Sequence, residues 1–163
     1  MCIRDSYRNA YPTMRGRADL YVAFFEAALR QLKHDGVCAF ICADRWMRNQ
    51  YGTELRRLIS SAYSVEMLLS MHHANAFDEE VDAYPAITII RHNKQQSTIV
   101  ARADQDAENI QPKLLATMLQ TNNRDILPQG IHRAVAVSYT HLRAHETVLD
   151  LVCRLLLEKK NNA

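Results

Sequence analysis

The two ends of the chain are related to each other through the genetic code. One allowed codon set for MCIRDS, residues 1–6, has a reverse complement that translates as AVSYTH, residues 136–141. No folding requirement links two peptides in this way, but one DNA sequence joined to both ends of an insert does. The relation therefore predicts that only residues 7–135 were selected to fold, as an internal piece of a longer gene.

The terminal segments resemble the translation of a transposon-type sequencing adapter. Residues 1–6 and 136–147 match the adapter in frame, and residues 151–160 resemble its outer primer running into an A-rich tail. We therefore expect 1–6 and 136–163 to be adapter-derived and to lie outside the sheet of the fold. The tail still has apolar residues near helical spacing, which predicts a loosely packed helix over about 141–160.

Removing these ends changes what composition implies. The whole chain has 20 basic and 18 acidic residues, and the ends hold five and four of them, which leaves 15 and 14. A nearly neutral insert gives no reason to expect a nucleic-acid or membrane partner from bulk charge. Cys38 and Cys42 remain, inside an apolar run that suits a reducing cytoplasm. No apolar stretch approaches the roughly 20 residues of a membrane span, so no membrane partner is expected.

Hydrophobic spacing predicts an α/β fold. From Arg17 to His34 apolar residues recur at intervals of three and four, which is typical of an amphipathic helix, and Gly36 ends it. The apolar run at 37–43 is typical of a strand buried on both faces of a parallel sheet. The other predicted elements are a helix after Gly52, strands at 64–71 and 86–90, a hairpin turn at 93–96 into a strand at 98–101, and a helix opened by Pro112.

This alternation predicts a mostly parallel sheet with an antiparallel hairpin edge. The domain division that follows is a partial domain at 7–110 and a helix and linker at 111–135. The residues predicted to be mostly buried around the sheet are Leu20, Phe24, Ala28, Leu32, Phe40, Ile41, Leu58, Leu68, Ile87 and Ile89.

Three sequence blocks, in this order and spacing, resemble a known family. An Asp-Leu-Tyr helix start at Asp19 is followed by an Asp-Gly turn at Asp35, an apolar strand and a loop bearing Trp46. An acidic loop at 77–84 then enters an Ile-rich strand. The blocks resemble the adenine-specific DNA methyltransferases of the Eco57I-like restriction-modification type, over roughly residues 11–92. The resemblance implies the C-terminal half of a Rossmann-like methyltransferase sheet from a bacterial cytoplasmic enzyme.

The resemblance also implies what the chain lacks. The intact parent would transfer methyl from S-adenosylmethionine to adenine N6 in DNA. The family's glycine-rich cofactor loop, its ribose-binding acid and its Asn-Pro-Pro-Tyr tetrad lie upstream of these blocks, and none occurs here, since all four prolines are isolated. We therefore expect no catalytic residue, no methylation by the chain alone and poor binding of S-adenosylmethionine. A target-recognition region would lie beyond the insert.

Candidate site residues follow from the same resemblance. The residues implied at the cofactor pocket are Asp19, Leu20, Tyr21 and Phe24. Those implied at the substrate are Asp44 and Trp46, just past the carboxyl end of a strand, and Phe77 and Tyr84, which would flank the extruded base. Each also has a plain structural interpretation: Phe24 as helix core, for example, and Trp46 as a loop anchor over the end of the sheet.

Other polar clusters predict no additional site. The acidic residues of 78–82 lack ordered ligand spacing and indicate a solvated loop, so no metal is expected. His72 and His73 suggest a strand-end pair, and His141 and His145 fall in the adapter-derived tail. The arginines at 45, 48, 56 and 57 fit either a phosphate-facing edge or, more commonly, a solvated face.

Two alternative functions remain open from the sequence. One is a fragment of another S-adenosylmethionine-dependent methyltransferase, acting on RNA or protein. The other is a non-enzymatic DNA-recognition module of a restriction system. The missing upstream segment would distinguish them: an Asn-Pro-Pro-Tyr-type tetrad after a glycine-rich loop would support the adenine methyltransferase, and its absence would support the recognition module.

Overall fold

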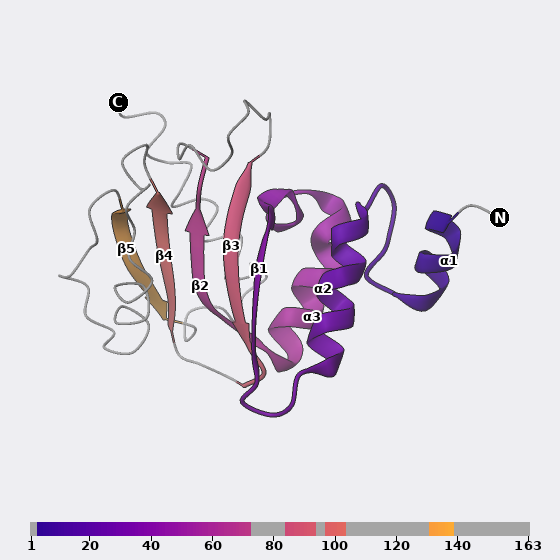
Figure 1. The fold of residues 1–163 in the computed structure, drawn as a ribbon, viewed down its shortest axis with the longest axis horizontal. Coiled ribbons are helices and arrows are strands. Elements are labelled where there is room, and N and C mark those ends of the chain that lie inside the picture. The colour runs from indigo at the N-terminus through magenta and orange to yellow at the C-terminus, as the bar shows by residue number, and fades with distance from the viewer. Residues whose placement is uncertain (1–2, 73–83, 94–96, 104–130, 139–163) are drawn as a thin grey trace.

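The computed structural model describes residues 3–72, 84–93, 97–103 and 131–138. These form three α-helices, two short 3-10 helices and five strands (Figure 1). In chain order they are α1 (Ile3–Ala10), α2 (Leu20–Gln31), β1 (Val37–Ala43), η1 (Asp44–Met47), η2 (Gln50–Gly52), α3 (Thr53–Ala62), β2 (Ser64–Ser70), β3 (Pro85–Arg91), β4 (Ser97–Ala103) and β5 (Ile131–Ser138). The strands predicted at 37–43, 64–71 and 86–90 are confirmed.

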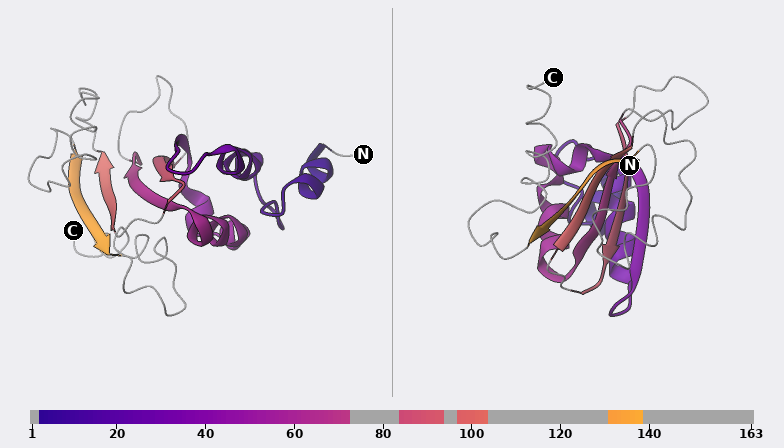
Figure 2. Two further views of the ribbon diagram at one scale, coloured as in Figure 1. Left: turned by 90° about the horizontal axis from the view of Figure 1, so that it is seen from below. Right: turned by 90° about the vertical axis from the view of Figure 1, so that its left-hand side faces the viewer.

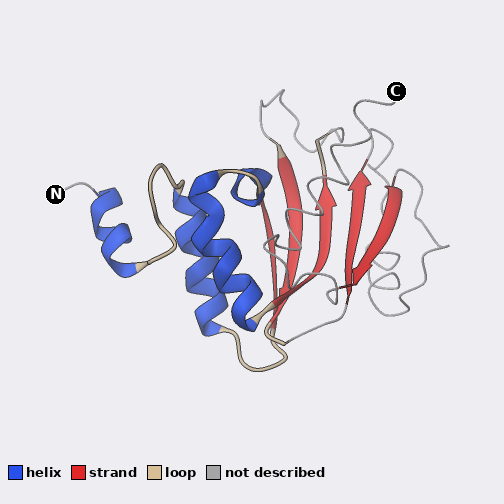
Figure 3. Ribbon diagram, turned by 180° about the vertical axis from the view of Figure 1, so that it is seen from behind, coloured by secondary structure: helices blue, strands red, loops and turns tan. Residues whose placement is uncertain are grey.

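The five described strands make one mixed sheet in the order β1-β3-β2-β4-β5. β1, β2 and β4 run in one direction, whereas β3 and β5 run in the other; only the β2–β4 pairing is therefore parallel. The predicted α/β class, with a majority strand direction and antiparallel members, is confirmed. The described helices all precede β2 in the chain, and Figure 3 shows them gathered beside the sheet.

The predicted hairpin between β3 and β4 is wrong. β3 inserts between β1 and β2 and pairs with both along its length, so neither of its edges is free for β4. Thr88 and Ile90 of this strand are fully buried, as befits an internal position. A turn signal at 93–96 predicts a change of direction but cannot choose the neighbour, and β4 pairs with β2 instead.

Helices α2 and α3 pack beside each other at the β1 end of the sheet, and α1 lies beyond them, away from the strands (Figures 1 and 2). α2 contacts β1, and α3 contacts β2. The principal core joins Phe25 and Leu29 of α2 to Leu55 of α3 and to Leu68 and Ile90 of the sheet. Because strand side chains alternate between faces, the neighbours Met67 and Leu69 belong to a second buried cluster, with Ile99.

Three predicted core residues are exposed. Leu20 and Phe24 are 38% and 50% exposed, because α2 turns Val22, Phe25 and Leu29 toward the core instead. Both sides of this helix are apolar, so periodicity alone could not select the inner one. Ile41 is 59% exposed, since β1 is the edge strand of the described sheet and the helices cover only its other face. Of the rest, Leu68 is fully buried; Ala28, Leu32, Phe40, Leu58, Ile87 and Ile89 are half-buried.

One of the two termini of the described chain differs from expectation. Residues 7–10 form a helix together with residues 3–6, and this helix, α1, lies outside the sheet as expected of its first residues. β5 crosses the predicted boundary at 135, and its last three residues pair with Ser97, Thr98 and Ile99 of β4. Alternating Val and Ala residues suit an edge strand whatever their origin, and strand pairing uses backbone groups that every sequence has. The helices predicted after Pro112 and at 141–160 lie outside the described residues.

Within the described part of the chain, no helix is both long enough and apolar enough to cross a bilayer.

Candidate functional site

Three sequence-distant residues meet at one end of the sheet. Asp44 directly follows β1, His72 lies two residues beyond β2, and Tyr84 directly precedes β3. Because β3 is antiparallel to the other two strands, its start lies at their carboxyl ends. Backbone bonds fix this junction: the Asp44 amide donates to the Tyr84 carbonyl at 3.0 Å, and the Met71 amide donates to the Pro85 carbonyl at 2.9 Å. Carboxyl ends of strands are where open α/β sheets place ligands.

The Asp44 carboxylate is the buried centre of this junction. Its Oδ2 accepts from the Arg48 guanidinium and lies 3.0 Å from His72 Nε2. Burial alone would raise the pKa of Asp44, but the hydrogen bonds and charges of His72 and Arg48 outweigh it and hold the pKa below its usual range. Asp44 therefore stays ionised at neutral pH and links the β1–η1 segment to the end of β2.

Tyr84 presents an aromatic surface beside this carboxylate. The residue is 44% exposed; the His72 ring centroid lies 4.9 Å from the Tyr84 ring centroid, and Arg45 Cζ lies 5.6 Å from it. A cavity of about 410 Å³ opens here. Its lining residues are Asp44, Arg45, Arg48, Asn49, His72 and Tyr84. The cavity thus combines an exposed ring face, two guanidinium groups, an amide and an anchored carboxylate.

Trp46 has a different position from the one predicted. It is fully buried, and its ring lies 5.3 Å from that of Phe25 on α2. Its carbonyl accepts from Arg56 at 2.6 Å, and Gly52 packs so closely that a Cβ there would lie 1.8 Å from the same oxygen. The indole N–H is buried without a partner among the described residues. Trp46 thus presents no surface to a ligand in this structure and anchors the loop that carries the site.

The four residues implied at the cofactor do not form a pocket with one another here. The Asp19 carboxylate caps α2 by accepting from the Leu20 amide at 2.6 Å. The Tyr21 hydroxyl lies 2.8 Å from that of Tyr51, and burial together with this hydrogen bond raises the pKa of Tyr21. Leu20 and Phe24 are exposed on α2, and none of the four lines the cavity beside Tyr84.

These residues fit S-adenosylmethionine only in part. Leu20 and Phe24 offer apolar contact area to a ring or a thioether. The one carboxylate nearby, that of Asp19, is already engaged with the helix backbone, so the ribose hydroxyls of the cofactor would need an acid from elsewhere. Among these four residues, exposed apolar surface is present and an unengaged carboxylate is not.

The sequence did not predict two residues that contribute to the site. His72 and Arg48 were assigned to a strand end and a solvated face, yet both bind Asp44. The i, i+4 spacing of Asp44 and Arg48 was a usable signal, whereas the approach of His72 depends on strand order that the sequence does not display. Phe77 lies outside the described residues.

Among the described residues, the site contains neither a metal-binding cluster nor an ionised thiol. No group of three or more His, Cys, Asp or Glu side chains among the described residues is placed to hold a metal ion. Burial and the charge of Asp44 raise the pKa of the Cys42 thiol to about 12, so this cysteine stays protonated at neutral pH. The groups that line the cavity are suited to recognise a planar, polar ligand through stacking and hydrogen bonds.

The sequence itself carries the family assignment. Residues 3–77 match the model of the family described as Eco57I restriction-modification methylase. These residues, fewer than half of the chain, are similar to that family. The resemblance stated above is confirmed, and the match includes residues 3–6, which the DNA relation assigns to the adapter.

Characterised relatives agree with this assignment. The chain is 44% identical over 95 residues to the type II methyltransferase M.PaeR7I of Pseudomonas aeruginosa, and 39% identical over 94 residues to M.BstVI of Geobacillus stearothermophilus. Each match covers 58% of this chain but 17% of the relative. The matched stretch therefore spans less than a fifth of the length of either relative, as is consistent with a fragment of such an enzyme.

Solved structures share the fold. The type IIG restriction endonuclease BpuSI superposes with a TM-score of 0.69 at 13% identity, covering 92% of this chain and 17% of that one. A class I S-adenosylmethionine-dependent methyltransferase from Listeria monocytogenes, described as putative, superposes with a TM-score of 0.54 at 14% identity, covering 73% and 37%. At these identities the likeness concerns the fold alone, and it places the sheet among class I methyltransferase folds.

Proposed function

We propose that the chain forms one wall of the methyltransferase domain of a parent enzyme that methylates adenine N6 in DNA. The observation that carries the proposal is the cavity at the carboxyl end of β1, lined by Tyr84, Arg45 and the Asp44–His72 pair; all of these but Tyr84 lie within residues 3–77, which match the Eco57I family. The methyl donor of the parent is S-adenosylmethionine, which supplies an activated methyl group when bound. The proposed domain division remains 7–110 and 111–135, and the proposed location of the parent is the bacterial cytoplasm.

Tyr84 is the proposed contact for the extruded base. Moving a base out of the duplex costs a few kcal/mol, and stacking on an aromatic ring returns about 1–3 kcal/mol. The Tyr84 ring packs against His72 at 4.9 Å and Arg45 at 5.6 Å, so its side chain would lose little conformational entropy when a base stacks on it. Asp44 acts on the base only through His72, as a positioning residue. Phe77 remains a second proposed contact.

We propose that residues of this chain and residues upstream of it in the parent together form the cofactor site. Leu20 and Phe24 would cover apolar parts of S-adenosylmethionine or of the segment that binds it, which accounts for two large apolar side chains left exposed on one helix. Asp19 and Tyr21 would fix the start of α2 through the cap and the bond to Tyr51. The ribose and the reacting amine would be held by residues of the parent upstream of this chain.

A chimera tests the proposal. The matching segment of M.PaeR7I is replaced by that of this chain, and transfer of labelled methyl from S-adenosylmethionine to DNA is measured, with the methylated base identified by mass spectrometry of nucleosides. We expect N6-methyladenine from the folded chimera and no transfer by the 163-residue chain alone. A folded chimera that methylates cytosine or no base, or transfer by the chain alone, would contradict the proposal.

A further inference from the structure

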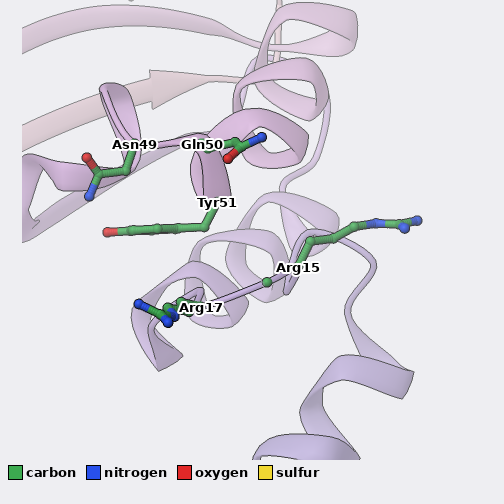
Figure 4. Close-up of a pocket in the computed structure, with 6 residues that line it drawn as sticks. Arg15, Arg17, Asn49, Gln50 and Tyr51 are labelled. Atoms are coloured by element: carbon green, nitrogen blue, oxygen red, sulfur yellow. The ribbon is translucent and has the colours of Figure 1, made fainter.

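We propose that a second groove, formed by the Arg15–Gly16–Arg17 turn and the Asn49–Tyr51 segment, binds the phosphodiester backbone of duplex DNA. This inference rests on the proposed function, since it supposes that the parent acts on DNA. The groove has a volume of about 630 Å³, and its lining residues are Arg15, Gly16, Arg17, Asn49, Gln50 and Tyr51 (Figure 4). None of the three residues proposed for the base, Tyr84, His72 and Asp44, lines it.

The two arginines are available for a ligand. Both are exposed, and among the described residues neither makes an ion pair or a side-chain hydrogen bond with the protein. By contrast, Arg8, Arg30, Arg48, Arg57 and Arg91 are each paired with a carboxylate. The nearest acid in sequence, Asp19, is occupied as the cap of α2. Unpaired guanidinium groups beside side-chain amides match the charge and geometry of phosphate oxygens.

A buried carboxylate of α2 holds the turn that carries these arginines in place. Glu26, only 2% exposed, accepts from the Thr13 amide at 2.9 Å and from the Thr13 hydroxyl at 2.6 Å, and Arg30 pairs with its other oxygen. Met14 and Ala18 are buried on either side of the apex. Gly16 takes a φ of +58°, a left-handed conformation that favours glycine and lets the two arginines flank the apex.

The opposite wall is equally fixed. Tyr51 is bonded to Tyr21 of α2, and Arg56 donates to the carbonyl of Asn49 at 3.0 Å. Figure 4 shows Arg15 and Arg17 projecting in opposite directions from their turn, with Tyr51 facing them. Each guanidinium would therefore contact a different phosphate. A polar groove between two anchored walls loses little entropy on binding a strand.

The groove adjoins the base site. Asn49 lines both the 630 Å³ groove and the 410 Å³ cavity that contains Tyr84. An enzyme that rotates a nucleotide out of the duplex must hold the backbone on which the nucleotide turns. A phosphate groove next to the aromatic cavity meets that need.

The test is the salt dependence of DNA binding. A fluorescently labelled duplex of about 20 base pairs is titrated with the 163-residue chain at several salt concentrations, and log K is plotted against log salt. Each lost phosphate contact lowers the slope by about 0.9, so Arg15→Gln/Arg17→Gln should lower it by about 1.8, equally for two unrelated duplex sequences. Arg15→Lys/Arg17→Lys should keep most of the slope.

A matched control removes the same charge elsewhere. Lys33→Gln/Arg57→Gln changes two exposed basic residues, one just beyond the C-terminal end of α2 and one on α3, and should leave the slope nearly unchanged. An equal loss in the control, an unchanged slope in the groove variant, or no binding of the duplex at low salt would overturn the inference. Methylation by the chimera is a separate outcome, so failure here leaves the proposed function standing.

Discussion

At the scale of single residues, Asp44 determines the geometry of the candidate base site. It is a buried carboxylate with two hydrogen-bonding partners from different segments, Arg48 one helical turn away and His72 beyond β2. Removing one member of such a cluster leaves the buried polar groups of the others without their hydrogen-bonding partner. The position of Tyr84 depends on the same cluster, because its ring packs against His72.

Asp44→Asn should lower the free energy of unfolding by about 2 kcal/mol at pH 7, since charge-assisted hydrogen bonds are lost. The folded-state pKa of Asp44 lies below its ordinary value, so its contribution is present above the unfolded pKa of about 3.9 and is lost as pH falls through the folded pKa. Urea unfolding of both proteins at pH 7, 5, 4 and 3 should show a difference that shrinks below about pH 4. A difference of the same size at every pH would contradict this account of Asp44.

At the scale of elements, the turn before α2 depends on one buried acid. Thr13 gives both its amide and its hydroxyl to Glu26, and the helix thereby holds the turn that carries Arg15 and Arg17. Thr13→Val keeps the shape but removes the hydroxyl donor, which should cost about 1 kcal/mol of stability. Thr13→Ser keeps the hydroxyl and should cost less. Thermal unfolding of the two variants measures this, and equal losses would show that the hydroxyl bond does not matter.

The edge strand β5 gives a test of the terminal segment. Its residues pair with β4 across the predicted boundary, so truncation after Ser138 and truncation after Gly130 should differ. The first removes only sequence predicted to be adapter-derived and should leave the thermal midpoint unchanged or raised. The second uncovers the edge of β4 and should lower the midpoint by a few degrees, as expected for a loss of about 1 kcal/mol. Equal midpoints for the two truncations would show that β5 does not stabilise the sheet.

The bounds of the helices and strands were more predictable from the sequence than the order of the strands in the sheet. Local signals, such as the apolar run of 37–43 and the polar break before Thr53, set the bounds of β1 and α3 closely. Strand order was not local: the insertion of β3 between β1 and β2 brings Tyr84 beside Asp44, and no spacing along the chain shows this. For the same reason Asp44 and Tyr84 could be proposed individually as site residues, whereas His72 could not.

At the scale of the whole molecule, the described fold has the features of one part of a larger domain. β1 is unpaired on one edge within the described sheet, and Val37 and Ile41 on it and Phe24 on α2 are exposed apolar side chains. The matches to M.PaeR7I and M.BstVI cover 17% of each relative. Apolar surface of this kind suits contact with further protein, and the remaining part of the parent would provide it.

The central claim is that Tyr84, held by His72 and Arg45, stacks on the base that the parent methylates. Its most direct test is kcat/KM for methyl transfer by the chimera carrying Tyr84→Ala, compared with Tyr84→Phe. Loss of a stacking ring is worth about 1–3 kcal/mol, so the kcat/KM of Tyr84→Ala should fall by about fivefold or more, whereas Tyr84→Phe, which keeps the ring, should stay within about threefold of the unsubstituted chimera. Equal rates for Tyr84→Ala and the unsubstituted chimera would contradict the account.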